Sequence, residues 1–122
     1  MECANVKENN VILEKSMKFA VRIVNLHQYL SEEKQEYVMS KQILRSGTSI
    51  GANVNEAVRG QSRNDFLSKM NIALKEVFET GYWLELMRRT AYISQDEYES
   101  INEDCNEIKK ILTSIIKSTK QN

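Results

Sequence analysis

The absence of proline is the feature that most constrains the fold, because none of the 122 residues is a proline. Proline breaks the interior of a helix, and glycine, the other strong breaker, occurs only four times. Apolar residues recur three and four positions apart along most of the chain, which is the spacing of one helical face. No alternation of period two, the mark of a strand, competes with this pattern. We therefore predict an all-α fold.

Turn and capping residues divide this helical chain into four segments. Gly60 suits the position after a helix end, and Ser62 and Ser94 favour helix N-caps. We predict helices over residues 10–30, 34–59, 63–90 and 95–119. Short turns between long helices make consecutive helices antiparallel, so we expect an up-down antiparallel four-helix bundle. Residues 1–122 form a single domain in this interpretation, because the length suffices for one core.

The charge and cysteine content excludes several classes of function. Lys and Arg together equal Asp and Glu at 17 each, so no overall field attracts nucleic acid or an anionic membrane. Two cysteines without a CxxC pair and a single histidine offer no set of metal ligands. A signal peptide and an apolar run of about 18 residues are both absent. We expect a cytoplasmic protein with no metal, no cofactor, no membrane contact and no small-molecule substrate.

Small residues crowd the predicted second helix between Leu44 and Gly60, where a bundle helix normally carries leucine. Gly47 and Gly51 lie inside this helix, although each glycine costs a helix about 1 kcal/mol relative to alanine. Two glycines four positions apart let another backbone approach closely, as at other helix interfaces built from small residues. We therefore expect Gly47 and Gly51 to serve close helix packing.

The same two glycines frame a G-x-S-x-G motif around Ser49, the pattern of a hydrolase nucleophile elbow. The elbow requires a strand before a sharp turn at the serine, whereas the flanks here are helical. The only histidine that could act as the base is His27, on another predicted helix. The Glu-x-x-His pairs of ferritin-like metal sites are also missing. We predict no catalytic residues and no enzymatic activity, and catalysis by Ser49 is a much weaker hypothesis.

A polar stripe of Arg45, Ser49, Asn53 and Glu56 lies roughly opposite the apolar stripe of the second predicted helix. One interpretation is a plain solvated helix face, which the residues alone favour. The other is a polar network between helices or subunits, in which Arg45 and Glu56 bond to neighbouring helices and Asn53 bridges them. Such a network would fix the register of the helices.

The third predicted helix carries apolar side chains on more of its circumference than one bundle core needs. Its main stripe runs from Phe66 to Met87, while Ile72, Trp83 and Leu86 lie about 100° to one side. An additional buried contact explains the surplus, and a subunit interface is its simplest form. We predict a homo-oligomer with Ile72, Trp83 and Leu86 in the interface.

A longer signature begins with Arg45-Ser46-x-x-Ser49-Ile50-x-Ala52-Asn53-Val54-x-Glu56-Ala57 and continues through Ser62-x-x-Asp65-Phe66, Ile72-Ala73-Leu74-x-Glu76, Glu79 and Tyr92-Ile93-Ser94. It resembles the signature of the 23S ribosomal-RNA intervening-sequence proteins, also called the four-helix-bundle protein family. The chain departs from many members at Gly51, where they carry proline, and at Ala57, where they carry glycine.

The resemblance implies an up-down helical bundle, often a homopentamer, with no known catalysis. Relatives include the accessory protein that assists reverse transcriptase in diversity-generating retroelements. The resemblance also favours the network interpretation, since the polar residues match the signature. The network then comprises Arg45, Ser49, Asn53, Glu56, Glu76 and Glu79.

Basic residues suggest candidate contacts to nucleic acid. Arg59 and Arg63 flank the turn between the second and third predicted helices, and Lys109 and Lys110 are assigned to the last turns of the fourth. An up-down bundle brings these two groups to the same end, where they could contact phosphates. We therefore consider RNA, DNA or a nucleic-acid enzyme as partners. The alternative is that these cations are merely solvated and the oligomer is a structural or protein-binding scaffold.

Overall fold

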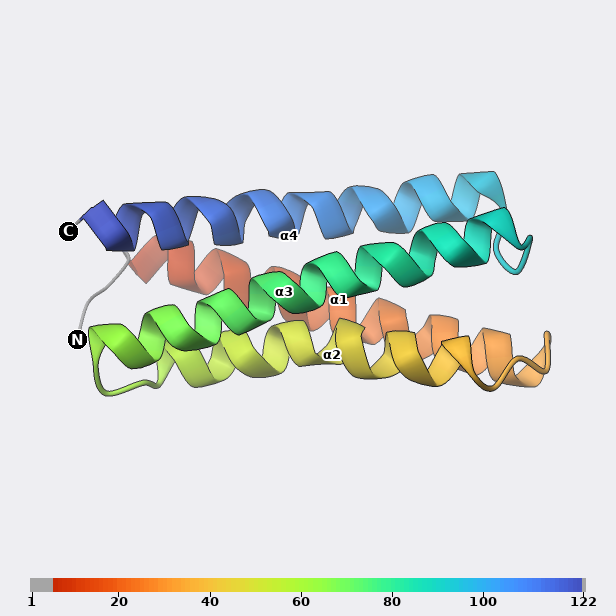
Figure 1. Cartoon of the computed structure of the whole chain (residues 1–122), viewed down its shortest axis with the longest axis horizontal. Coiled ribbons are helices and arrows are strands. Elements are labelled where there is room, and N and C mark those ends of the chain that lie inside the picture. Colours follow the sequence, from red (N-terminus) through yellow and green to blue (C-terminus); the bar gives the residue numbers. More distant parts are fainter. Residues whose placement is uncertain (1–5, 122) are drawn as a thin grey trace.

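The computed structural model describes residues 6–121 and consists of four long α-helices with consecutive helices antiparallel (Figure 1). They are α1 (Val6–Glu32), α2 (Met39–Val58), α3 (Arg63–Arg89) and α4 (Gln95–Gln121). Each helix packs against its neighbours in sequence, and α4 closes against α1, so that α1 and α3 lie diagonally across the bundle. No strand occurs between residues 6 and 121. The predicted four-helix bundle is confirmed.

The predicted start of the second helix at residue 34 is wrong, because α2 begins at Met39. Gln35 adopts a left-handed backbone conformation with φ of 54°, which interrupts the helical path after α1. The Glu36 carboxylate then accepts hydrogen bonds from the backbone N–H groups of Val38, Met39 and Ser40, at 3.1, 3.0 and 2.8 Å. A carboxylate satisfies these free donors and is stabilised by the positive end of the helix dipole. A glutamate in the connection between α1 and α2 thus fixes where α2 begins.

The two serine caps lie where the sequence predicts them. The Ser62 hydroxyl accepts a hydrogen bond from the backbone N–H of Asp65 at 3.0 Å, and Ser94 accepts one from Glu97 at 3.1 Å. Each cap satisfies a donor that the first helical turn leaves free, which stabilises a helix by about 1 kcal/mol. The starts of α3 and α4 therefore follow from local sequence.

The core is built from apolar side chains at the three-four spacing of each helix. Fully buried examples from the four helices are Ile12, Ile23, Leu30, Ile43, Ile50, Val54, Met70, Leu84, Met87, Leu112 and Ile115. A buried hydrogen bond of 3.0 Å joins the hydroxyls of Thr80 and Ser46 between α3 and α2. A hydroxyl in an apolar interior requires such a partner, so this pair also fixes the relative height of the two helices.

Helix α2 approaches α1 closely at Gly47 and Gly51. A Cβ atom added at Gly47 would lie 2.7 Å from Cγ1 and 2.8 Å from Cγ2 of Ile23, which is closer than real atoms come. A Cβ atom at Gly51 would lie 3.3 Å from the backbone oxygen of Ser16. Ile23 and Ser16 are themselves buried, so neither can yield freely. The absence of a side chain at Gly47 therefore sets the distance between α1 and α2.

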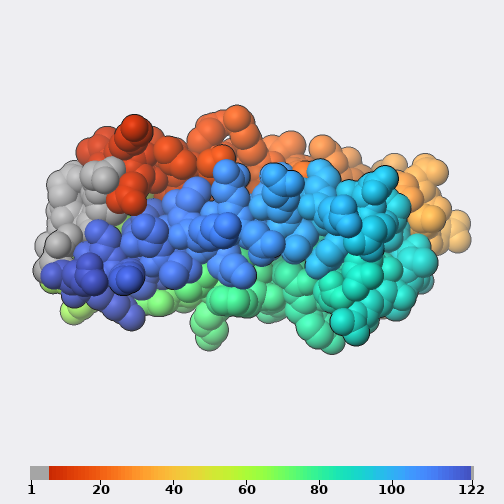
Figure 2. Space-filling model, turned by 90° about the horizontal axis from the view of Figure 1, so that it is seen from above, coloured from red at the N-terminus to blue at the C-terminus, as the bar shows by residue number. Residues whose placement is uncertain are grey.

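Helices α1 and α4 pack less closely, and charged side chains bridge the seam between them. Figure 2 shows the two helices side by side along the elongated surface. Lys15 pairs with Glu107 at 3.0 Å, and Arg22 contacts Asp104 at 2.9 Å and the Ser100 hydroxyl at 2.7 Å. These pairs are partly exposed, and exposed ion pairs contribute little stability each. The helices within residues 6–121 include none with the length and apolarity that a bilayer crossing needs.

We predict that Gly47→Ala lowers the free energy of unfolding, measured by denaturant titration followed by circular dichroism. Overpacking against Ile23 costs about 1–3 kcal/mol, and the better helix propensity of alanine returns only about 1 kcal/mol. Gly81→Ala is the matched control, because a Cβ atom there meets nothing within 4 Å. Gly81 lies inside α3, so its replacement should raise stability by roughly 0.5–1 kcal/mol. Equal shifts for the two variants would contradict this explanation of Gly47.

Candidate functional site: the α2–α3 face

The residues predicted to form a polar network gather on the outer face shared by α2 and α3. The stripe from Arg45 to Glu56 lies on α2, and Glu76 and Glu79 lie beside it on α3. We call this surface, with Ile72, Trp83 and Leu86, the α2–α3 face. The structure therefore brings two separately predicted sets of residues, the polar network and the oligomer interface, to a single surface.

The hydrogen bonds of the α2 stripe run within the helix. The Ser49 hydroxyl donates to the backbone oxygen of Arg45 at 2.6 Å, and the Asn53 amide donates to the backbone oxygen of Ser49 at 2.8 Å. The contact that crosses to α3 is an ion pair of 2.9 Å between Glu56 and Lys69. Ser49 and Asn53 thus bond locally, and a network that extends to another subunit stays a prediction.

Glu76 is the least satisfied group of the face. Its Oε1 atom is buried and has no hydrogen-bond partner within residues 6–121. Burial raises the pKa of this carboxyl, and the neighbouring Glu79 raises it further, while the charge of Arg45 on α2 opposes both effects. Glu79 itself accepts a hydrogen bond from the Trp83 indole at 3.2 Å. The charge of Arg45 on α2 thus favours the ionised form of Glu76 on α3.

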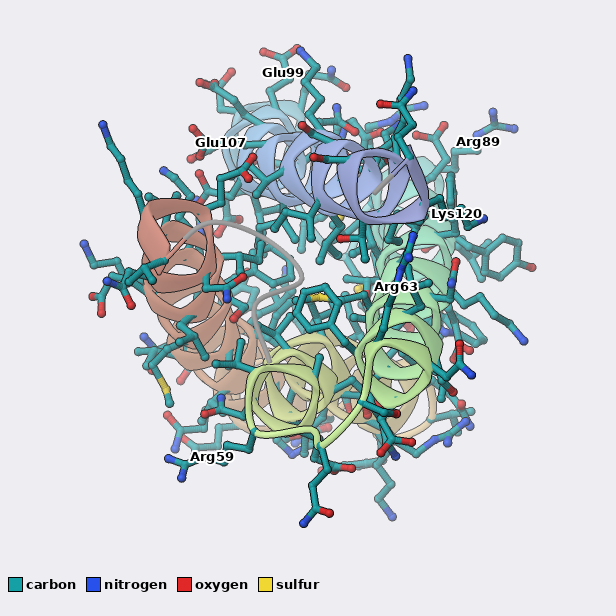
Figure 3. All side chains as sticks on the ribbon, turned by 90° about the vertical axis from the view of Figure 1, so that its left-hand side faces the viewer. Arg59, Arg63, Arg89, Glu99, Glu107 and Lys120 are labelled. Atoms are coloured by element: carbon teal, nitrogen blue, oxygen red, sulfur yellow. The ribbon has the colours of Figure 1, made fainter. Side chains whose placement is uncertain are left out.

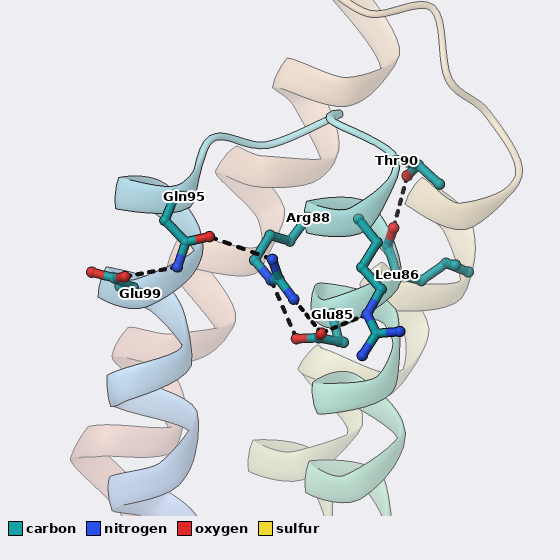
Figure 4. A network of polar contacts seen from close by, with 7 residues as sticks. Glu85, Leu86, Arg88, Thr90, Gln95 and Glu99 are labelled. Carbon is teal, nitrogen blue, oxygen red and sulfur yellow. Dashed lines mark hydrogen bonds and ion pairs between the residues drawn. The ribbon is translucent and has the colours of Figure 1, made fainter.

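Glu85, at the far end of α3, has the opposite environment. Its carboxylate accepts hydrogen bonds from Arg88 at 2.5 Å and from Arg89 at 2.7 Å, and Arg88 also reaches Gln95 of α4 (Figure 4). Arg88, then Arg89 and Tyr98, lower the pKa of Glu85 to about 2. Two glutamates of one helix thus have pKa values shifted in opposite directions, Glu85 downward by hydrogen-bond donors and Glu76 upward by burial.

Apolar exposure on α3 extends beyond the α2–α3 face. Ile72 is 36% exposed, and Trp83 and Leu86 are half-buried. Phe78 and Tyr82 are more exposed, at 59% and 61%, and the Tyr82 ring meets Trp83 edge to face with centroids 5.1 Å apart. Sequence reasoning did not assign Phe78 and Tyr82 to the interface, although their displacement from the Phe66–Met87 stripe is a signal that they leave the core.

A second apolar surface lies on α1 and was also missed. Met17 and Val21 are each 55% exposed, and Val24 is 38% exposed. Their positions, four and three apart, place them on one side of α1, directed away from the core. The unusual width of the apolar arc in residues 10–30 is the sequence signal that indicates this surface.

Two of the four basic residues predicted to contact nucleic acid are engaged elsewhere in the fold. Arg59 and Arg63 lie at the same end of the bundle as Lys120 (Figure 3). Arg63 donates a hydrogen bond to the backbone oxygen of Thr119, so it caps the end of α4. The ammonium of Lys109 lies over the Phe78 ring, 5.7 Å from its centroid.

The placement of Lys109 and Lys110 in the last turns of the fourth helix is wrong. Helix α4 continues to Gln121, so these lysines lie near its middle, roughly 18 Å from that end at the usual helical rise. They are therefore separated from the end at which Arg59 lies. Exposed cations that do accompany Arg59 at this end include Lys117 and Lys120.

The G-x-S-x-G motif lies in the middle of α2 and lacks the strand and turn of a nucleophile elbow. The Ser49 hydroxyl bonds to the helix backbone, while His27 Nδ1 lies 3.1 Å from the backbone oxygen of Ser40. Serine and base are therefore not brought together. In the described part of the chain, no three His, Cys, Asp or Glu side chains gather where they could hold a metal ion.

Comparison with known proteins places the chain in a family. The family model described as "23S rRNA-intervening sequence protein" matches residues 8–114. The chain belongs to this family. A solved crystal structure of a protein with unknown function from the S23 ribosomal protein family of Bacteroides thetaiotaomicron is similar, with a TM-score of 0.89 and 64% sequence identity. The similarity covers 90% of this chain and 98% of that one. No functionally curated protein matched the chain.

For this member of the 23S rRNA-intervening sequence family, we predict that Glu76→Gln changes the pH dependence of stability. The pKa of Glu76 in the folded state is raised above 4.5, so the protonated carboxyl contributes to the stability of the wild type below pH 4.5. This contribution is lost as pH rises through the folded-state pKa. The free energy of unfolding of Glu76→Gln, relative to wild type, should therefore increase from acidic to neutral pH.

Glu85→Gln is the control with the opposite sign. The pKa of Glu85 is lowered from 4.5 to about 2, so its contribution is present above pH 4.5 and is lost as pH falls toward 2. Wild type should therefore gain stability over Glu85→Gln as pH rises from 2 to 4.5. Urea titrations from pH 2 to neutral pH measure both variants, and a pH dependence parallel to that of wild type for either variant would overturn its assignment.

Proposed function

We propose that this protein is a non-enzymatic binding protein that acts as a homo-oligomer, with a pentamer as the expected size. The observation that carries the proposal is the exposure of large apolar side chains on α1 and α3, above all Met17, Val21, Phe78 and Tyr82. Large exposed apolar patches mark protein interaction sites, whereas single exposed apolar residues do not. Membership of the family supports the pentamer through the resemblance described above.

The buried, unpartnered oxygen of Glu76 supports the same proposal. A buried polar atom without a partner costs about 1–3 kcal/mol, so native proteins rarely retain one without reason. Glu76 lies beside Ile72 and Trp83 on the α2–α3 face, where a neighbouring subunit could supply the missing donor. The same contact between subunits would then form the oligomer and give the Glu76 carboxylate its hydrogen bond.

We predict that the purified chain is oligomeric at micromolar concentration by multi-angle light scattering. Phe78→Lys should reduce the particle mass, because it places a charge in the apolar surface, and should leave the helical circular dichroism spectrum unchanged. Tyr37→Lys is the matched control, since Tyr37 is 55% exposed but lies in the α1–α2 turn. A monomeric wild type would rule out the proposal.

A second candidate function is sequence-tolerant contact with RNA or DNA at the end formed by the α2–α3 turn and the C-terminus of α4. The observation that favours it is that Arg59 and Lys120 both lie at this end as exposed cations, with exposed Lys117 in the last turns of α4. A closed oligomer would repeat these cations around one rim. The electrostatic potential at a surface depends on where charges lie close together more than on the net charge. The neutral net charge favours the alternative, a scaffold that binds only protein.

We predict that labelled RNA or DNA binds the oligomer in about 50 mM salt, where screening is weak, and dissociates steeply as salt rises. Arg59→Gln combined with Lys120→Gln should abolish binding without a change in particle mass. Lys34→Gln combined with Lys41→Gln, two exposed cations near the opposite end, is the control and should keep binding. If the intact oligomer binds neither nucleic acid, the protein scaffold is favoured, and a reverse transcriptase gene beside this one would then name the class of partner.

A further inference from the structure

A pocket of about 350 Å³ lies on the seam between α1 and α4, toward the end of the bundle where α1 ends and α4 begins (Figure 1). Its apolar wall consists of Leu26 on α1, Ile93 in the α3–α4 connection and Ile101 on α4. Ile93 and Ile101 belong to the buried core and Leu26 packs against it, so this wall is a fixed part of the fold. The volume lies at the lower end of the range for small-molecule sites, which is about 300–1,000 Å³.

Arg22 bounds the pocket on the side toward the middle of the bundle. Its guanidinium donates hydrogen bonds to the Asp104 carboxylate at 2.9 Å and to the Ser100 hydroxyl at 2.7 Å, both on α4. Two hydrogen bonds from one planar group hold this side chain in place across the seam. The Asp104 carboxylate already compensates the charge of Arg22, so Arg22 shapes the pocket without making it a site for anions.

The polar side chains on the rim of the pocket are Asn25 and Tyr29 from α1 and Glu97 from α4. Within residues 6–121 the side-chain oxygens of these residues have no hydrogen-bond partner. An amide oxygen, a phenol oxygen and a carboxylate all accept hydrogen bonds. The ammonium of Lys34, outside the pocket lining, lies 5.9 Å from the centroid of the Tyr29 ring, so this ring already accepts a cation beside it.

The charges around the pocket favour a cationic ligand. Among the ion pairs of residues 6–121, none involves Asp96, Glu97, Glu99 or Glu103 in the first half of α4. These carboxylates leave a negative potential over this end of the seam, because local potential follows the position of charges. An anionic ligand would be repelled, and a neutral apolar ligand would cover Glu97 without giving this carboxylate a partner, which is costly.

We propose that this pocket binds a small primary amine, in which one ammonium group is attached to a short apolar chain or ring. A primary ammonium carries three N–H donors and no acceptor, which matches the amide, hydroxyl and carboxylate oxygens on the rim. The apolar body of the ligand would cover the wall formed by Leu26, Ile93 and Ile101. A quaternary ammonium has no N–H to donate to these oxygens and is recognised by aromatic cages, whereas Tyr29 is the single aromatic residue in the lining of this pocket.

The shape of the pocket favours a free small molecule over an extended peptide. Arg22 bounds the pocket along the seam on one side and Ile93 lies at the other, so a short ligand fits between them. The inference goes beyond the proposed function, because one copy of the chain forms the whole pocket and no oligomer is needed. It concerns a ligand that is bound and not converted, and therefore no enzymatic activity.

Titration of the methyl-labelled protein with butylamine, hexylamine and phenethylamine at neutral pH tests the proposal by nuclear magnetic resonance. At least one of these amines should shift the methyl signals of Ile93 and Ile101 in a saturable way. The signals of Ile43 and Ile50, which lie on α2, should stay in place. The matched alcohol and carboxylate keep the apolar body and lose the ammonium, so they should bind more weakly by roughly tenfold or more, the loss expected for a hydrogen bond to a charged group.

Glu97→Gln should weaken binding of the same amine by roughly tenfold or more, because it removes the charge of the acceptor. Glu103→Gln is the matched control, since it removes the same charge from an exposed position of α4 outside the pocket. The control should keep the affinity of wild type, and circular dichroism checks that both variants are folded.

Three results would overturn amine recognition: no saturable shift with any of the amines, equal binding of the matched alcohol, or equal losses for Glu97→Gln and Glu103→Gln. A lysine-containing peptide that binds more tightly than the free amine would overturn the small-molecule ligand and make the pocket a protein contact. The particle mass from light scattering tests the proposed oligomer separately, so the two proposals fail by different measurements.

Discussion

The close contact between α1 and α2 at Gly47 is the constraint on which the rest of the bundle depends. With Ile23 filling the space that a side chain would need, α2 can approach α1 only with a glycine at this point. That approach directs the apolar edge of α2 inward and its polar stripe outward toward the side of α3. The buried hydrogen bond between Ser46 and Thr80 then sets the height of α3 against α2. The polar α2–α3 face is therefore a consequence of how α2 rests on α1.

This face combines features that seldom occur together on a surface without a partner. It carries a cation, two neighbouring carboxylates and a partly exposed tryptophan, and one carboxylate oxygen is buried without a donor among residues 6–121. Nearer the C-terminal end of α3, Glu85 shows that the chain can satisfy a glutamate fully when arginines lie one turn away. The unsatisfied state of Glu76 is thus a property of its place on the surface and not of glutamates in this helix generally.

Sequence reasoning predicted the fold well because its signals are local. Ser62 and Ser94 cap the helices that follow them, and the spacing of buried residues needs no knowledge of neighbouring helices. The start of α2 was predicted too early, because Glu36 caps this helix from within the α1–α2 connection and Gln35 adopts a left-handed conformation, for which neither side chain gives a clear signal.

The candidate site was harder to predict, because contacts between distant segments decide it. The sequence predicts Arg63 and Lys109 as free cations. In the folded chain Arg63 donates a hydrogen bond to the backbone oxygen of Thr119, and Lys109 lies over the Phe78 ring. The exposure of Phe78 and Tyr82 likewise depends on how far α4 covers the side of α3. Helical spacing gives the direction of a side chain but not what lies beyond it.

The unequal edges of α1 have a consequence for its motions. One edge rests on α2 through close contact at Ile23 and Ser16, while charged pairs bridge the other edge to α4. Added salt weakens the charged edge and leaves the apolar edge intact. Local opening of the bundle should therefore begin between α1 and α4, with α1 pivoting on α2, and amide hydrogens along that seam would exchange before those at the glycine contact.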